Sequence, residues 1–201
     1  MISQEKIKKI LEEYSYLNIT NDALKQIGND EEKKLLESGR YDIVNLENEI
    51  RAKLASIIES ELKNPEKAYE TLNNYINKKL SKIQNPEESL NEFRDFMIKY
   101  DYLLDIETIK KLIEENDTLV KILEATLETV LYSGKNRDKN IARLFVIYCH
   151  IKNIPLEKKD RGNETVKYGY EAYEETMRSC AKLSDEEQSK YIEQLAKLEF
   201  I

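Results

Sequence analysis

The chain has 201 residues, of which 35% are charged and 40% hydrophobic, and its formal net charge is -7. This balance is typical of a soluble globular protein and not of a disordered one, and only 5 Gly and 3 Pro argue against a turn-rich all-β fold. No apolar run reaches the roughly 18 residues of a membrane span, and none near the amino terminus has signal-peptide length. Two cysteines, Cys149 and Cys180, are too few for a disulfide scaffold, so we expect a cytoplasmic protein.

Residues 1–39 contain three short apolar patterns, which we expect to form three small helices that cap the rest of the fold. Glycine readily adopts the left-handed conformation that follows many helix ends, so Gly28 is expected to end the second helix and Gly39 the third. Side chains that can accept hydrogen bonds from a first helical turn mark the expected starts, at Ser3, at Thr20 or Asn21, and at Asp30.

The middle of the chain predicts a series of longer helices. Asp42 begins a helix that ends at Asn64-Pro65, and its apolar residues recur at spacings of three and four: Ile43, Leu46, Ile50, Leu54, Ile57, Ile58 and Leu62. The signal Asn64-Pro65-Glu66 recurs as Asn85-Pro86-Glu87, and each Asn is expected to cap a helix that begins with the following Pro. Asp105 is expected to cap another helix, with a break near Asn116.

These patterns contain no strand that can be defended. They predict an all-α fold, an irregular multi-helix bundle or short superhelix of about ten helices without a sheet. Residues 1–155 are expected to form the main helical domain. Residues 156–201 are expected to form a carboxy-terminal helical hairpin packed on it in one continuous fold, after the polar connection of residues 156–163.

Residues 140–151 form the longest run that is apolar on nearly every side of a helix. Two stripes result, one of Ile141, Leu144, Phe145, Tyr148 and Ile151 and the other of Ala142, Val146 and Cys149. A helix that is apolar all round is buried on several sides, so we expect other helices to surround this one.

The same run contains the chain's single histidine, His150, seven residues after Arg143. Two helical turns separate them, so both side chains are expected to point the same way. This spacing resembles the motif of the HEPN ribonucleases, helical bundles that pair two such motifs across a homodimer. The resemblance implies that His150 takes a proton from a ribose hydroxyl and that Arg143 holds the phosphate, without a metal. That family usually has a polar residue directly after the arginine, whereas Leu144 follows it here.

A second alternative is a nucleic-acid-binding regulatory protein. Residues 135–161 contain eight Lys/Arg and three Asp/Glu, whereas the rest of the chain contains 24 and 36. A local positive charge can attract phosphates, although the overall negative charge disfavours general nucleic-acid binding. The residues expected to make these contacts are Lys135, Arg137, Lys139, Lys158, Lys159 and Arg161.

The sequence favours a third function over both alternatives, a non-enzymatic interaction or regulatory protein that binds another protein through a helical surface. It shows no assembled catalytic site, no metal-ligand cluster and no cofactor motif. Exposed tyrosines are common in protein interfaces, so the expected contact residues are Tyr168, Tyr170 and Tyr173. The expected partner is another protein, with a homodimer left open and no membrane contact.

Overall fold

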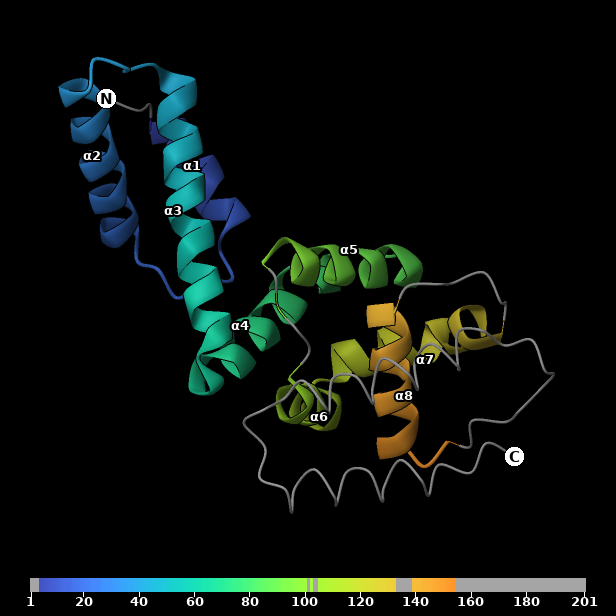
Figure 1. The fold of residues 1–201 in the computed structure, drawn as a ribbon. Coiled ribbons are helices and arrows are strands. Elements are labelled where there is room, and N and C mark those ends of the chain that lie inside the picture. Colours follow the sequence, from blue (N-terminus) through green and yellow to red (C-terminus); the bar gives the residue numbers. More distant parts are fainter. Residues whose placement is uncertain (1–3, 101, 103–104, 133–138, 155–201) are drawn as a thin grey trace. The chain divides into compact units, whose positions relative to one another are not determined.

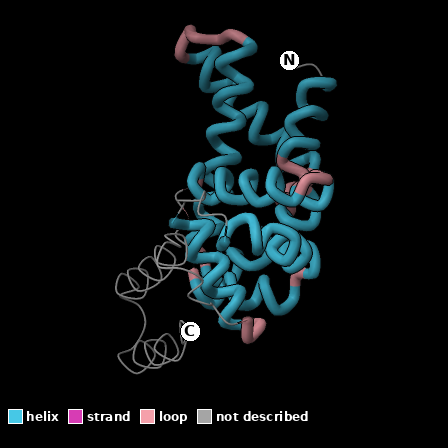
Figure 2. The backbone as a smooth tube through the Cα atoms, turned by 90° about the vertical axis from the view of Figure 1, so that its right-hand side faces the viewer, coloured by secondary structure: helices cyan, strands magenta, loops and turns pink. Residues whose placement is uncertain are grey.

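The computed structural model describes residues 4–100, 102, 105–132 and 139–154 (Figure 1). These residues form eight α-helices and one short 3-10 helix, and they contain no strand (Figure 2). The all-α class predicted from the sequence is therefore confirmed for this part of the chain. No helix within it combines the length and the apolar character that a bilayer span requires.

The chain divides into two compact units, which are described separately. The first contains the described residues of Met1–Lys82 and Lys99–Tyr102, with α1 (Gln4–Glu13), α2 (Asn21–Glu37), α3 (Ile43–Lys63), α4 (Pro65–Lys78) and the 3-10 helix η1 (Leu80–Lys82). The second unit contains the described residues of Ile83–Ile98 and of the chain after Tyr102. Its helices are α5 (Pro86–Lys99), whose last residue belongs to the first unit, α6 (Ile106–Glu115), α7 (Asp117–Tyr132) and α8 (Lys139–Ile151). The hairpin expected at residues 156–201 lies outside the described residues.

The long helix α3 provides the main buried stripe of the first unit. Every fourth residue of this helix is buried, in the series Leu46, Ile50, Leu54, Ile58 and Leu62. Helices α2 and α4 pack against α3 (Figure 1), and α1 is tied to it by two ion pairs, Lys6 with Glu47 at 2.7 Å and Glu13 with Arg51. The 3-4 spacing therefore predicted this helix and most of its buried face correctly.

Helix α2 differs from the prediction, because it is one continuous helix where two short ones were expected. Thr20 does cap its start, accepting a hydrogen bond from Ala23 N at 3.1 Å. Gly28 does not end a helix, and the chain stays helical from Asn21 to Glu37. Gly28 is buried where α2 lies against Ile50 of α3. The prediction that Gly28 ends a helix was wrong because this glycine serves a helix contact and not a helix end.

The predicted helix starts at Asn64, Asn85 and Asp105 are confirmed. Asn64 Oδ1 accepts from Glu66 N at 3.0 Å, and Asn85 Oδ1 accepts from Glu87 N at 2.9 Å. In both cases the helix begins with the proline that follows. Asp105 Oδ2 accepts from Thr108 N at 3.1 Å at the start of α6.

Helix α8 packs against α6 and α7 in the second unit. Its side chains at Ile141, Leu144, Phe145 and Cys149 are fully buried, and Tyr148 is 2% exposed. The Phe145 and Tyr148 rings meet edge to face at 6.5 Å between centroids. The expected burial of residues 140–151 is thus confirmed for six side chains of the run, whereas Ile151 at its end is partly exposed.

Candidate protein-interaction surface

The connection between α2 and α3 is closed by a left-handed glycine. Gly39 has φ 67°, which strains any residue with a side chain. Its N–H donates to Leu36 O, and Arg40 N–H donates to Leu35 O, each at 3.2 Å. This pair of bonds is the Schellman arrangement, which satisfies carbonyls that a helix end otherwise leaves unpaired. The predicted role of Gly39 in ending the helix is therefore confirmed.

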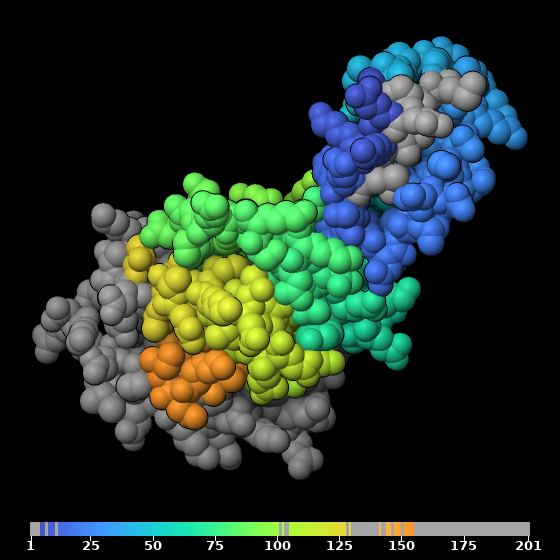
Figure 3. Space-filling model, turned by 180° about the vertical axis from the view of Figure 1, so that it is seen from behind, coloured from blue at the N-terminus to red at the C-terminus, as the bar shows by residue number. Residues whose placement is uncertain are grey.

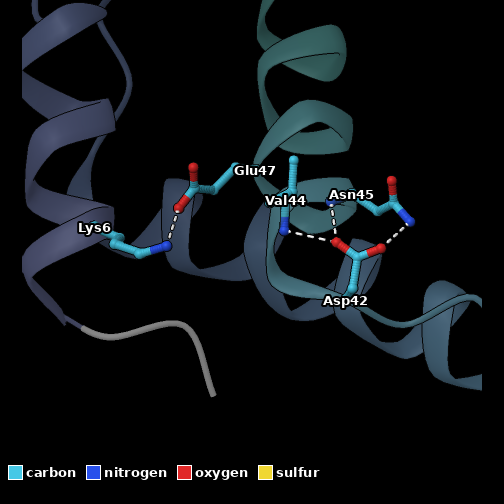
Figure 4. A network of polar contacts seen from close by, with 5 residues as sticks. All are labelled: Lys6, Asp42, Val44, Asn45 and Glu47. Atoms are coloured by element: carbon cyan, nitrogen blue, oxygen red, sulfur yellow. Dashed lines mark hydrogen bonds and ion pairs between the residues drawn. The ribbon is translucent and has the colours of Figure 1, made fainter.

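Asp42 fixes the other side of this connection by capping α3 (Figure 4). Its Oδ1 atom accepts hydrogen bonds from Val44 N and Asn45 N, both at 2.9 Å. The Asn45 amide donates in turn to Asp42 Oδ2 and, at 3.3 Å, to Arg40 O. Backbone and side-chain bonds thus hold both sides of the turn, so it presents its side chains in a defined arrangement.

We define the hairpin tip as residues 36–44, at one end of the first unit (Figure 3). Two of its large apolar side chains are strongly exposed, Leu36 at 59% and Val44 at 61%, and two are exposed to a smaller degree, Tyr41 at 38% and Ile43 at 37%. Among the described residues, only one other large hydrophobic side chain, Ile98, is as open to solvent. Scattered exposed apolar residues are ordinary on proteins, whereas a cluster of them marks an interaction site.

Acidic residues outnumber basic ones in the sequence around the hairpin tip. Residues 30–49 contain seven Asp/Glu and three Lys/Arg. The Tyr41 hydroxyl donates to Glu32 Oε1 at 3.3 Å, and desolvation followed by the Glu32 charge raises the pKa of Tyr41. Glu47 bonds to Lys6 on the side of α3 (Figure 4), and this bond lowers the pKa of Glu47. The tip therefore combines an apolar centre with a negatively charged surround.

Four tyrosines, Tyr14, Tyr16, Tyr75 and Tyr100, form a separate buried cluster in the first unit. The Tyr16 and Tyr75 rings meet edge to face at 5.1 Å, and Lys79 Nζ lies 5.9 Å from the Tyr16 centroid. Lys79 also donates to Glu12 O at the end of α1, at 2.9 Å. Burial raises the pKa of Tyr16, and it raises that of Tyr100 to about 12. These hydroxyls therefore stay protonated near neutral pH, and their rings pack in the core of the first unit.

Two shallow hollows lie on the first unit. One, of about 370 Å³, is lined by residues of α1, of the link after it, of α2 and of α3, including Lys8, Glu12, Tyr14 and Leu54. The other, of about 360 Å³, lies beside the hairpin tip and is lined by acidic and basic side chains, including Asp30, Lys33, Lys34 and Glu37. Five of the nine residues that line the first hollow are apolar or aromatic, whereas the second is lined mainly by charged side chains, unlike most small-molecule sites.

The ribonuclease pair predicted from the sequence falls on α8. Arg143 and His150 are both part of this helix, two turns apart, but their side chains lie outside the described part of the chain. Within that part, no group of three or more His, Cys, Asp or Glu side chains could hold a metal ion. Cys149 is a buried free thiol whose pKa burial raises to about 12, so it does not provide a thiolate near neutral pH.

The remaining predicted contact residues also fall outside the description. Lys139 is described only as the first residue of α8, without its side chain. The others lie outside the described residues: Lys135, Arg137, Lys158, Lys159, Arg161, Tyr168, Tyr170 and Tyr173. The structure therefore brings none of these predicted groups together in a described site.

The hairpin tip was not predicted from the sequence, because Ile43 fits the apolar spacing of the helix that begins at Asp42. The adjacent apolar pairs Leu35-Leu36 and Ile43-Val44 give no signal of exposure, because other adjacent pairs of this chain, such as Leu112-Ile113 and Leu144-Phe145, are fully buried.

The chain matches no protein-family model, and no curated protein or solved structure is detectably similar to it.

Proposed function

We propose that this chain is a non-enzymatic interaction or regulatory protein that binds another protein, and that the hairpin tip is its binding surface. The observation that supports the proposal is the exposure of Leu36, Tyr41, Ile43 and Val44 together on a turn fixed by Gly39 and Asp42. A backbone that is fixed before binding loses little entropy on association, and this favours affinity for the apolar and aromatic side chains that it carries.

The tip can be disabled without disturbing the core. Replacing Leu36→Gln and Val44→Gln removes two of its apolar side chains and keeps α2 and α3 helical. A tagged full-length chain is mixed with native lysate, and retained proteins are identified by mass spectrometry. The proposal predicts a protein partner that the unchanged chain retains and the double variant loses. Ile98→Gln, at the exposed position of α5, is the matched control and retains the partner. Equal retention by all three chains contradicts the proposal.

The finer features expected from the sequence belong to the same proposal. We propose that further helices beyond the eight described complete an irregular bundle or short superhelix of about ten helices, and that the protein acts in the cytoplasm.

Nucleic-acid binding through residues 135–161 remains a prediction. It is tested by measuring whether the affinity of the protein for RNA or DNA falls steeply as the salt concentration rises.

The ribonuclease alternative also remains a prediction. Incubation of the protein with mixed RNA, beside a His150→Ala variant, tests it directly. Cleavage by the unchanged chain alone supports the pair of Arg143 and His150, and equal or absent cleavage by both chains removes it.

A further inference from the structure

The hairpin tip presents two kinds of chemistry to a partner, an apolar centre and a negative surround. We infer that its partner is a protein segment with apolar side chains flanked by lysine and arginine. This inference rests on the proposed function and adds the partner's chemistry to it.

The negative charge remains after the nearby ion pairs are taken into account. Lys34 pairs with Glu31 at 2.6 Å, and Lys6 pairs with Glu47 at 2.7 Å. Lys33 lies 4.0 Å from Glu37, and both side chains are largely exposed, at 77% and 68%. Residues 30–49 contain seven carboxylates and three basic residues, and two basic side chains from other stretches lie beside them, Lys6 and Lys53, so the acids still outnumber the bases by seven to five.

Several carboxylates lie directly beside the apolar side chains. Glu37 follows Leu36 in the chain, Asp42 lies between Tyr41 and Ile43, and Glu32 accepts the Tyr41 hydroxyl bond. Within residues 36–44 the one basic residue is Arg40, which precedes Tyr41. A partner that covers the apolar side chains must therefore bring its own groups next to these charges. Lysine and arginine are favoured there, because like charges in such positions weaken association and unpaired buried charges cost several kcal/mol.

The same charge argues against other occupants. Membrane surfaces and nucleic acids carry negative charge, so electrostatic attraction does not bring them to this tip. Two copies of the tip facing each other would place like charges together, which opposes a symmetric dimer at this surface. A partner with a basic rim is the remaining class that matches both properties.

Photo-cross-linking from within the tip tests this inference. Val44 is replaced in the full-length chain by photoreactive benzoylphenylalanine, the chain is irradiated in native lysate, and the cross-linked peptide of the partner is sequenced. The expected product is a peptide of another protein that combines apolar residues with an excess of Lys and Arg. Its yield is expected to fall at least about tenfold between 50 and 500 mM salt, as screened charge attraction should.

A pair of charge variants provides the control. Glu37→Lys and Glu114→Lys each change an exposed acid in the last turn of a helix, α2 or α6, where a lysine is tolerated. The inference predicts that Glu37→Lys lowers the cross-link yield at 50 mM salt by about tenfold and that Glu114→Lys changes it less than about twofold.

The outcomes separate the two proposals. A protein adduct that Leu36→Gln abolishes, but that is indifferent to Glu37→Lys and to salt, keeps the binding surface and overturns the basic partner. A cross-linked partner peptide without an excess of Lys and Arg also keeps the binding surface and overturns the basic partner. Adducts only with lipid, with nucleic acid or with a second copy of this chain, or no adduct at all, contradict both proposals.

Discussion

Gly28 of α2 lies against Ile50 of α3, and a Cβ atom added to this glycine would meet Ile50 Cδ1 at 3.7 Å. That distance is ordinary van der Waals contact, so alanine fits without displacing α3. Glycine inside a helix costs about 0.5–1 kcal/mol relative to alanine. We expect Gly28→Ala to raise the free energy of unfolding by that amount, measured by urea denaturation. A loss of stability would show that the helices pack more closely here than the structure describes.

Gly39 predicts the opposite result at a site with more space. No atom lies within 4 Å of a Cβ added there, yet its φ of 67° is left-handed. The left-handed conformation raises the free energy of a residue with a side chain by about 1–2 kcal/mol. Gly39→Ala is therefore expected to lower the free energy of unfolding by about that amount, in the same urea experiment as Gly28→Ala. Equal effects of the two substitutions would contradict the assigned conformations.

The buried tyrosines predict a loss of stability at alkaline pH. The pKa of Tyr100 is raised from 10.0 to about 12 and that of Tyr16 is raised further in the same direction, mainly by burial. Above about pH 10 the unfolded chain therefore releases these protons before the folded chain does, which stabilises the unfolded state. The stability that the two protonated hydroxyls contribute is fully present below pH 10. The part due to Tyr100 is lost as the pH rises through about 12, and the part due to Tyr16 is lost at higher pH. Denaturant titrations between pH 7 and pH 12, followed by circular dichroism, check this.

Tyr16→Phe identifies the group responsible. The hydroxyls of Tyr16 and Tyr100 share a hydrogen bond in the folded chain. At pH 7 its removal is expected to cost about 0.5–1.5 kcal/mol, a usual value for such a bond. As the pH rises above 10 the variant should lose less stability than the unchanged chain, because it lacks one buried ionisable group. Parallel pH profiles for the two chains would assign the alkaline loss to other residues.

Cys149 is expected to be unreactive in the folded protein. Its side chain is fully buried, and its pKa of about 12 leaves almost no thiolate at pH 8. Iodoacetamide at pH 8 should modify the Cys149 peptide only after denaturant is added, as followed by mass spectrometry. Rapid modification of the native chain would contradict the packing of α8 against α6 and α7.

Local chemistry explains which parts of the fold could be predicted from the sequence. Asn64, Asn85 and Asp105 accept hydrogen bonds from amides two or three residues ahead, so their neighbours in sequence are sufficient to identify them. The apolar run of α8 was predictable for a similar reason, because a helix without a polar face needs other helices around it.

Features that depend on distant residues could not be predicted in the same way. Gly28 looks like a helix end in sequence, and only its contact with Ile50 shows why a helix continues through it. The spacing of apolar residues indicates which residues share a helix face. It does not indicate how far along that helix the neighbouring helices extend. Ile43 shares a spacing pattern with Leu46, yet Ile43 is 37% exposed and Leu46 is fully buried. The hairpin tip could not be predicted, because the spacing does not indicate that neighbouring helices leave Ile43 uncovered.

The most direct test of the hairpin tip is its contribution to the stability of the isolated protein. Side chains that await a partner should contribute little, so Leu36→Gln and Val44→Gln are each expected to change the free energy of unfolding by less than about 0.5 kcal/mol. Leu46→Ala, in the fully buried part of α3, should cost about 2–5 kcal/mol in the same urea titration. A loss of that size from Leu36→Gln or Val44→Gln would show that the folded chain already covers the tip, and would contradict its role as a binding surface.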